Sequence, residues 1–252
     1  MVRKSLATVS IVCILTAVVA DISKADVSMT QHVKVSPSPG EWTRTLRIKG
    51  LKMRIDTVRN GENLITIYDL SSGKGYQLDA KRKEIIVADL KSPSASKNEL
   101  SADNLRRTFK ETGKKKEIGS ISCDEYVFDL PGPAAAFGHG MAVVQDESGT
   151  LCVSQTIPEG IEVVHFVREA IKRGYGLATA PLGPTKTSIG LYFSGQEPNM
   201  LIVAGTVQYR TKEIGVPSGS MPTVTYTLTI SDIKSDSIPD EVFQIPAWKE
   251  KK

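Results

Sequence analysis

Apolar and polar side chains alternate along residues 42–49 and again along residues 51–56. This pattern restricts the fold more than any other feature of the chain. A period of two places successive side chains on opposite faces, which is typical of a β-strand with one buried and one solvated face. The apolar members of the two runs are Trp42, Leu46, Ile48, Leu51, Met53 and Ile55.

Turn signals divide the first third of the chain into short strands of this kind. The sequence Asn60-Gly61 is a strong hairpin signal, because both residues tolerate positive φ. Further breaks are expected at residues 37–40, 71–73 and 80–83. We therefore expect five or six consecutive antiparallel strands, a meander, over residues 26–90. After residue 60 the expected strands are Leu64–Leu70, Gly75–Asp79 and Glu84–Leu90.

Two helices are predicted in the second part of the chain. The first begins at Ser101 as its N-cap, carries Phe109 on its apolar face and ends at Gly113. The second and clearer one runs from Glu159 to Arg173 and is followed by Gly174 as a stop signal. Its expected apolar face consists of Ile161, Val164, Val167 and Ile171.

The remaining segments predict further strands in the same domain. A hairpin is expected between residues 141–145 and 151–155, with Asp146-Glu147-Ser148-Gly149 as its turn, and Pro131–Gly140 is expected to be a loop. Other strands are expected over residues 115–121, 125–130, 188–194, 200–210 and 223–233. No linker is long enough to divide the chain. The sequence therefore predicts one α+β domain over residues 26–252, with about eleven strands and two helices.

The first 25 residues predict a cleaved secretory signal. Arg3 and Lys4 precede a charge-free apolar run, Leu6–Ala20, and small residues follow at 23 and 25. We expect cleavage after Ala25, with Ala20 as the second candidate. A retained membrane anchor is the alternative, but the run of 15 residues is shorter than the roughly 20 needed to span a bilayer. The predicted location is the periplasm, with no transmembrane segment in the mature chain.

The charge of the mature chain gives no indication of a nucleic-acid partner. The full chain carries 32 basic and 28 acidic residues, but three of the basic residues and one acidic residue lie within the first 25. The remaining excess of two positive charges is too small to predict binding to nucleic acid.

Cys123 and Cys152 are the two cysteines of the expected mature chain. An even number of cysteines in an exported chain predicts a disulfide between them. Two buried free thiols are the alternative. Neither cysteine belongs to a C-x-x-C motif, and no histidine lies within five residues of either. The sequence therefore offers little support for a zinc or thioredoxin-like site.

Motifs that carry catalysis are missing from the sequence. G-x-S-x-G, H-E-x-x-H and the phosphate-binding glycine loop do not occur. The histidines His32, His139 and His165 are interpreted as surface or helix-face residues, although His139 between two glycines is also a candidate base or metal ligand. We therefore expect no enzymatic activity, no metal site and no cofactor.

Residues 106–117 carry six basic and two acidic side chains. One hypothesis is that this patch binds anionic lipid head groups, to which each basic residue near a membrane contributes up to about 1 kcal/mol. The favoured interpretation is a solvated helix end and strand edge, where lysines prevent pairing with another sheet.

Several short motifs occur along the mature chain: I-K-G-L-K-M-R-I-D at residues 48–56, Y-D-L at 68–70, K-G-Y-Q-L-D at 74–79, G-S-I-S-C-D-E-Y at 119–126 and I-P-D-E-V-F-Q-I-P at 238–246. Their order resembles a family of exported bacterial domains of unknown function related to the outer-membrane lipoprotein carriers and their receptors. The resemblance implies a curved antiparallel sheet, an unclosed half-barrel, wrapped over helices around an apolar cavity. In the carriers that cavity holds acyl chains. This chain departs from the carriers in its longer middle, at residues 131–140 and 174–184.

Two functions follow from this picture. The first is a soluble periplasmic protein that binds a lipid, an acyl chain or another apolar molecule in the concavity of its sheet. The second is a structural or protein-interaction module of the cell envelope whose cavity is filled by its own side chains. By alternation along the strands, the candidate lining residues are Leu51, Met53, Ile55, Ile65 and Ile67.

Overall fold

The computed structural model describes residues 26–37, 40–59, 61–91, 109–130, 134–137, 141–175, 200–214 and 223–251. The predicted signal peptide with Ala25, the start of the helix predicted from Ser101, His139 and the strand predicted over 188–194 lie outside these residues.

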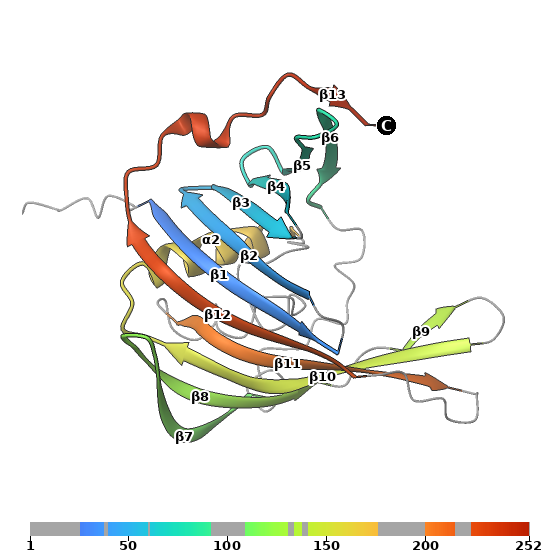
Figure 1. Cartoon of the computed structure of the whole chain (residues 1–252), viewed down its shortest axis with the longest axis vertical. Coiled ribbons are helices and arrows are strands. Elements are labelled where there is room, and N and C mark those ends of the chain that lie inside the picture. Colours follow the sequence, from blue (N-terminus) through green and yellow to red (C-terminus); the bar gives the residue numbers. More distant parts are fainter. Residues whose placement is uncertain are drawn as a thin grey trace, which may run out of the picture.

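The described residues form one large antiparallel sheet (Figure 1). Its strand order is β13-β6-β5-β4-β3-β2-β1-β12-β11-β10-β8-β7, with β9 beside β10. In chain order the strands are β1 (Val27–Ser36), β2 (Gly40–Lys49), β3 (Lys52–Arg59), β4 (Glu62–Asp69), β5 (Lys74–Asp79), β6 (Glu84–Asp89), β7 (Phe109–Ile118), β8 (Ile121–Leu130), β9 (Ala134–Phe137), β10 (Met141–Ser154), β11 (Leu201–Ile214), β12 (Val224–Ser235) and β13 (Lys249–Glu250).

The first six strands form the predicted meander. Each pairs with the next in an antiparallel register from β1 to β6. The hairpin predicted at Asn60-Gly61 joins β3 to β4, pairs Arg59 with Glu62, and holds Gly61 at a φ of +77°. The alternation seen in the sequence is therefore realised as strands with one buried and one solvated face.

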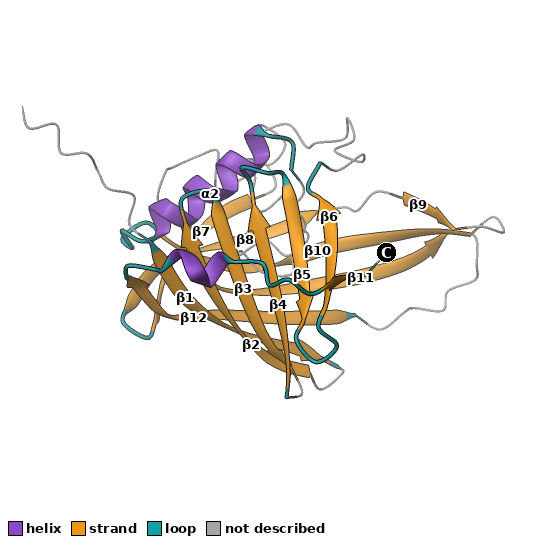
Figure 2. Cartoon of the chain, turned by 90° about the horizontal axis from the view of Figure 1, so that it is seen from above, coloured by secondary structure: helices purple, strands orange, loops and turns teal. Residues whose placement is uncertain are grey.

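The sheet bends but does not close. Its end strands are β13 beside β6 at one end and β7 at the other, and these ends do not pair with each other within the described residues. Within the described residues one α-helix, α2 (Gly160–Lys172), lies over one face of the bent sheet and contacts both β2 and β11 (Figure 2). A short 3-10 helix, η1 (Asp240–Phe243), precedes β13. The described fold is thus mostly β. The sequence predicted an α+β domain with two helices, and this prediction gave too much helix for the described residues.

The helix predicted over Glu159–Arg173 is confirmed as α2, but its buried face differs from the expected one. Ile161 is 46% exposed, whereas Val164 and Val167 are buried as predicted. The other buried side chains are Val163, Phe166 and Ala170. The buried face of the helix is therefore centred on Val163, Phe166 and Ala170, with Val164 and Val167 beside them, and it leaves Ile161 at the surface.

Residues 109–113 are strand rather than helix. Phe109 starts β7, pairs with Phe128 of β8 and stacks on its ring with the centroids 5.2 Å apart. Pairing with β8 therefore overrides the local helical spacing on which the prediction depended.

Residues 141–154 form one continuous strand, β10, rather than a hairpin. Residues 142–154 of β10 pair with β11, including Asp146-Glu147-Ser148-Gly149, which was predicted to be a turn. Gly149 is needed inside the strand because a Cβ there would lie 1.9 Å from the carbonyl oxygen of Thr206. The glycine marks a close approach of two backbones and not a turn. Within the expected loop Pro131–Gly140, residues 134–137 form β9.

Candidate ligand-binding face

The inner face is defined here as the sheet face that carries α2. In β1 and β2 it consists of alternate residues that pair directly across the two strands, including Met29 with Leu46 and Val27 with Ile48. All four are at most 1% exposed and belong to the same apolar cluster as Phe166 of α2. The inner face beneath α2 is therefore a packed core built from both halves of the sheet.

The five predicted lining residues lie on two opposite faces of the sheet. Met53 and Ile55 are buried on the inner face, and Leu51 packs against the same cluster. Ile67 pairs with Arg54 and Ile65 with Asp56, so both point to the outer face. The register set by the hairpin at residues 60–61 places them there, because residues opposite each other in an antiparallel pair share a face. The five side chains do not form one continuous lining.

The outer face carries its own apolar cluster, formed by Ile67, Leu78 and Ile85. The C-terminal tail covers it, since Ile245 and Trp248 pack against this cluster. The tail is held by backbone bonds from Lys249 to Lys83 and from Lys251 to Ile85, and by Arg54, which donates to the carbonyl of Val242 over 2.8 Å.

The carboxylates of Asp56 and Asp69 accept hydrogen bonds at two separate places in the sheet. Asp56 accepts a 2.5 Å hydrogen bond from Arg47 and a 2.8 Å bond from Arg54 on the outer face. Asp69 caps the β4–β5 turn by accepting the backbone N–H of Ser71 over 2.8 Å. The two carboxylates therefore do not lie together as a catalytic pair would.

The inner face continues beyond the core that contains α2. A separate buried cluster lies in β1, β2 and β12, toward the strand ends that are away from the core beneath α2. It consists of Val33, Trp42 and Leu228, with Val35 and Tyr226 packed against it. Val33 pairs with Trp42 on one side and with Leu228 on the other. We call this group the distal cluster.

Between the distal cluster and the core lies a polar pair. Arg44 of β2 stands directly opposite Gln31 of β1, and Gln31 is 0% exposed. The Arg44 guanidinium lies 5.7 Å from the centre of the Trp42 ring, and the guanidinium of Arg59 lies 5.0 Å from the same ring. Burial lowers the pKa of Arg44 from its ordinary value, against an opposing effect of the phenols of Tyr68 and Tyr226.

On the other side of the distal cluster, Tyr226 meets the ring of Tyr209 edge-on, with the centroids 5.4 Å apart. Tyr209 pairs with Glu147 across β10 and β11, and Glu147 is 3% exposed. Burial raises the pKa of the Tyr209 phenol, and the charge of Glu147 adds to the effect. Sequence reasoning missed these polar groups. Arg44 breaks the apolar side of the alternation between Trp42 and Leu46, and that interruption was the available signal.

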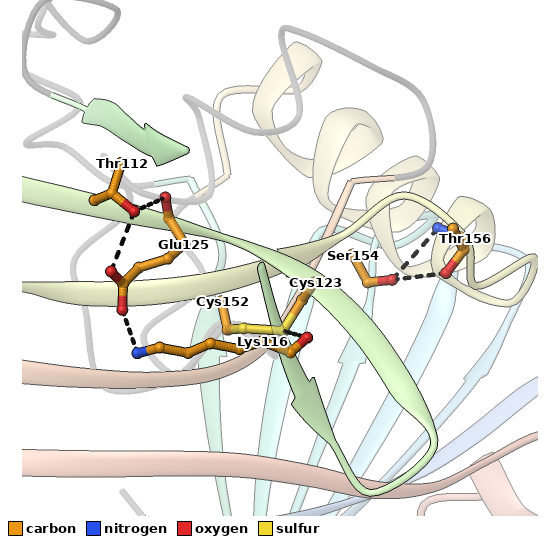
Figure 3. Close-up of a disulfide and its surroundings, with 7 residues drawn as sticks. All are labelled: Thr112, Lys116, Cys123, Glu125, Cys152, Ser154 and Thr156. Carbon is orange, nitrogen blue, oxygen red and sulfur yellow. Dashed lines mark hydrogen bonds and ion pairs between the residues drawn. A yellow bond between two sulfur atoms is a disulfide. The ribbon is translucent and has the colours of Figure 1, made fainter. Parts of the chain in front are cut away.

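The predicted disulfide is present in the structure. Cys123 of β8 and Cys152 of β10 are bonded, with their Cα atoms 5.4 Å apart (Figure 3). Beside it, Glu125 forms an ion pair with Lys116 and accepts a 3.1 Å hydrogen bond from the hydroxyl of Thr112. The bond from Lys116, aided by that of Thr112, lowers the pKa of Glu125.

The lysines of residues 114–116 lie on β7, which is an edge strand. Lys116 is paired with Glu125, and Lys114 Nζ lies 4.0 Å from the same carboxylate. This placement agrees with the strand edge of the favoured interpretation, whereas the expected helix end is wrong because residues 109–118 belong to β7.

The remaining candidates for chemistry lie apart from one another. His32 is exposed on β1 and contacts Ser231 and Thr43, and His165 lies on α2. The described part of the chain contains no group of three or more metal-ligating side chains. Within the same residues, no helix has the length and apolar character required to cross a membrane.

No protein-family model and no curated protein matches the chain. Several solved structures are similar to it, including the following two. An uncharacterized conserved protein from Thermus thermophilus is 6% identical over 91% of each chain, with a TM-score of 0.41. A LolA superfamily protein from Nitrosomonas europaea is 6% identical over 88% of this chain and 91% of its own, with a TM-score of 0.29. At these identities and scores the comparisons assign the chain to no family.

Proposed function

We propose that this chain is an exported binding protein that holds an apolar molecule, such as a lipid or an acyl chain, against the inner face of its sheet. The observation that supports this most is the extension of buried apolar surface past the core beneath α2 into the distal cluster. The helix contacts β2 and β11, and the distal cluster is separate from the apolar cluster that contains the buried side chains of the helix.

The physical reason lies in the open shape of the sheet. A closed barrel buries its inner side chains against one another, but an unclosed sheet needs a cover for its concave face. Among the residues that the structure describes, α2 with its 13 residues is the one α-helix lying over that face. An apolar ligand held against the inner face would gain about 25 cal/mol for each Å² of apolar surface removed from water. Binding of this kind requires no catalytic group.

Export is part of the proposal. The disulfide between Cys123 and Cys152 is of the kind that persists in an oxidising compartment, and it supports a periplasmic location. The apolar run at residues 6–20 supports export through a cleaved signal. N-terminal sequencing of the protein recovered from the periplasm tests this part, with Asp26 as the expected first residue.

Ligand binding is tested by organic extraction of protein purified without detergent, followed by mass spectrometry of the extract. We expect an apolar molecule bound in a fixed ratio to the chain. Leu228→Ala in the distal cluster and Leu78→Ala in the outer cluster are matched variants, because both leucines are at most 4% exposed.

Both variants should lose about 2–5 kcal/mol of stability. Only Leu228→Ala should also reduce the amount of bound molecule. Equal retention by the two variants would place the ligand elsewhere, and an extract without any apolar molecule, together with failure to bind added fatty acid, would end the proposal.

A second candidate function is an interaction module of the cell envelope whose concavity is filled by its own side chains. The packing beneath α2 favours it, because Val163, Phe166 and Ala170 are all 0% exposed. In that case the protein should bind no apolar molecule, and chemical cross-linking in intact cells should instead yield a specific protein partner.

A further inference from the structure

We propose that Arg44, together with Arg59 around the ring of Trp42, binds the anionic head group of an amphiphilic ligand, a carboxylate or a phosphate ester, whose apolar tail lies on the distal cluster. This inference rests on the proposed function and adds the charge of the ligand and its orientation.

The first step is the position of Arg44 on the apolar inner face. Its neighbours on the same side of β2 are Trp42 and Leu46, and Gln31 stands opposite on β1. Those three residues are at most 9% exposed, whereas Arg44 is partly exposed. A guanidinium remains charged at any physiological pH. The face therefore carries a fixed positive charge within an apolar surface.

The second step is the missing countercharge. On the outer face of the same strands, Arg47 and Arg54 both bind Asp56, and Lys49 binds Asp240 over 3.0 Å. For Arg44 and Arg59 the described residues supply no carboxylate within 4.0 Å, only the ring of Trp42.

Glu62 stands opposite Arg59 in the register, but no ion pair joins them in the part of the chain that the structure describes. A partly buried charge without a partner is costly, and an anion supplied by a ligand would remove that cost.

The third step concerns the kind of anion. Guanidinium groups bind carboxylate and phosphate oxygens through paired N–H donors. Arg59 is exposed, Arg44 is partly exposed and Val33 of the distal cluster is buried. An anion bound by the two guanidiniums would lie beside the ring of Trp42, a member of the apolar distal cluster. A charge next to apolar side chains suits an amphiphile and not a free inorganic anion.

The experiment compares ligands that share a tail and differ in charge. Calorimetric titration of the delipidated protein should give at least tenfold tighter binding for oleate or oleoyl lysophosphatidate than for oleyl alcohol. The ratio between the two acids identifies the head group as carboxylate or phosphate. Inorganic phosphate alone should bind much more weakly than either.

Arg44→Met keeps an unbranched apolar side chain at this position and removes the charge. It should abolish the preference for the acids while leaving the affinity for oleyl alcohol unchanged, and Arg44→Lys should restore part of the preference. Arg47→Met on the outer face is the matched control and should leave all affinities unchanged. Without ligand, Arg44→Met should melt at the same temperature as the wild type or higher, because an unpaired charge has been removed.

The outcomes separate this inference from the proposed function. Equal binding of acid and alcohol by the wild type, or a preference that survives Arg44→Met, overturns the head-group site and leaves apolar binding intact. Failure of all three amphiphiles to bind overturns both.

Discussion

Cys123 and Cys152, at a sequence separation of 29, join β8 to β10, and β10 is one of the longest strands of the sheet. The two cysteines are not directly opposite in the register, since Cys152 pairs with Glu125. The bond therefore crosses the ladder diagonally and fixes β8 against β10 independently of their hydrogen bonds.

Removing this bond should destabilise the protein by about 3 kcal/mol, because the unfolded chain would regain the freedom of a loop of about 30 residues. The measurement is urea unfolding of the double variant Cys123→Ala/Cys152→Ala. A reducing agent should lower the stability of the wild type by a similar amount and leave the variant unchanged. An identical response of both proteins to the reductant would contradict the prediction.

The pair formed by Glu125 and Lys116 predicts a pH dependence of stability. Because Lys116 lowers the pKa of Glu125 in the folded protein, the unfolded state takes up a proton more readily. The stabilisation is therefore present above the ordinary pKa of a glutamate and is lost as pH falls through the lowered value. Unfolding free energies measured between pH 7 and pH 3 should fall more steeply for the wild type than for Lys116→Met. Parallel curves would show that the pair contributes nothing.

Gly149→Ala should destabilise the protein by about 3 kcal/mol or prevent folding, because the new methyl group would meet the backbone of Thr206. The neighbouring variant Ser148→Ala, on the opposite face of β10, should cost less than about 1 kcal/mol. Thermal unfolding of the two variants provides the comparison. A Gly149→Ala protein as stable as the wild type would mean that β10 and β11 do not approach as closely as the structure has them.

Phe243→Ala should cost about 3 kcal/mol, since this side chain of η1 is 4% exposed and its loss leaves a cavity under the C-terminal tail. Glu241→Ala, on an exposed position of the same turn, should be nearly neutral. If the tail is the cover of the outer cluster, Phe243→Ala should also increase the fluorescence of a dye that binds apolar surface. Equal stability of the two variants would show that η1 is not anchored through Phe243.

The strands of the first half could be predicted because alternation and turn residues are local signals. The pattern along residues 42–56 and the hairpin at Asn60-Gly61 both agree with the structure. The same hairpin also fixes which residues of the two strands share a face. Pairing Arg59 with Glu62 already places Ile65 and Ile67 opposite Asp56 and Arg54, and hence on the outer face.

The second half was less predictable because long-range pairing decides it. Phe109 became strand through its contact with Phe128, and the polar run at residues 146–149 became the middle of β10 through its pairing with β11. Neither partner is visible from local sequence. For the candidate site, the apolar inner face could be predicted in part, but the tyrosines and Glu147 around the distal cluster come from strands far apart in the chain.

The first strand lies in the middle of the sheet, between β2 and β12. The distal cluster can therefore assemble only after Leu228, which lies near the end of the sequence, is available to pair with Val33. Contacts of such wide sequence separation form late and slow the folding of β-proteins. A chain still being threaded through a membrane from its N-terminus would have β1 on the far side long before its second partner arrives. The proposed capacity to hold a ligand would, on this topology, be the last property that the growing molecule acquires.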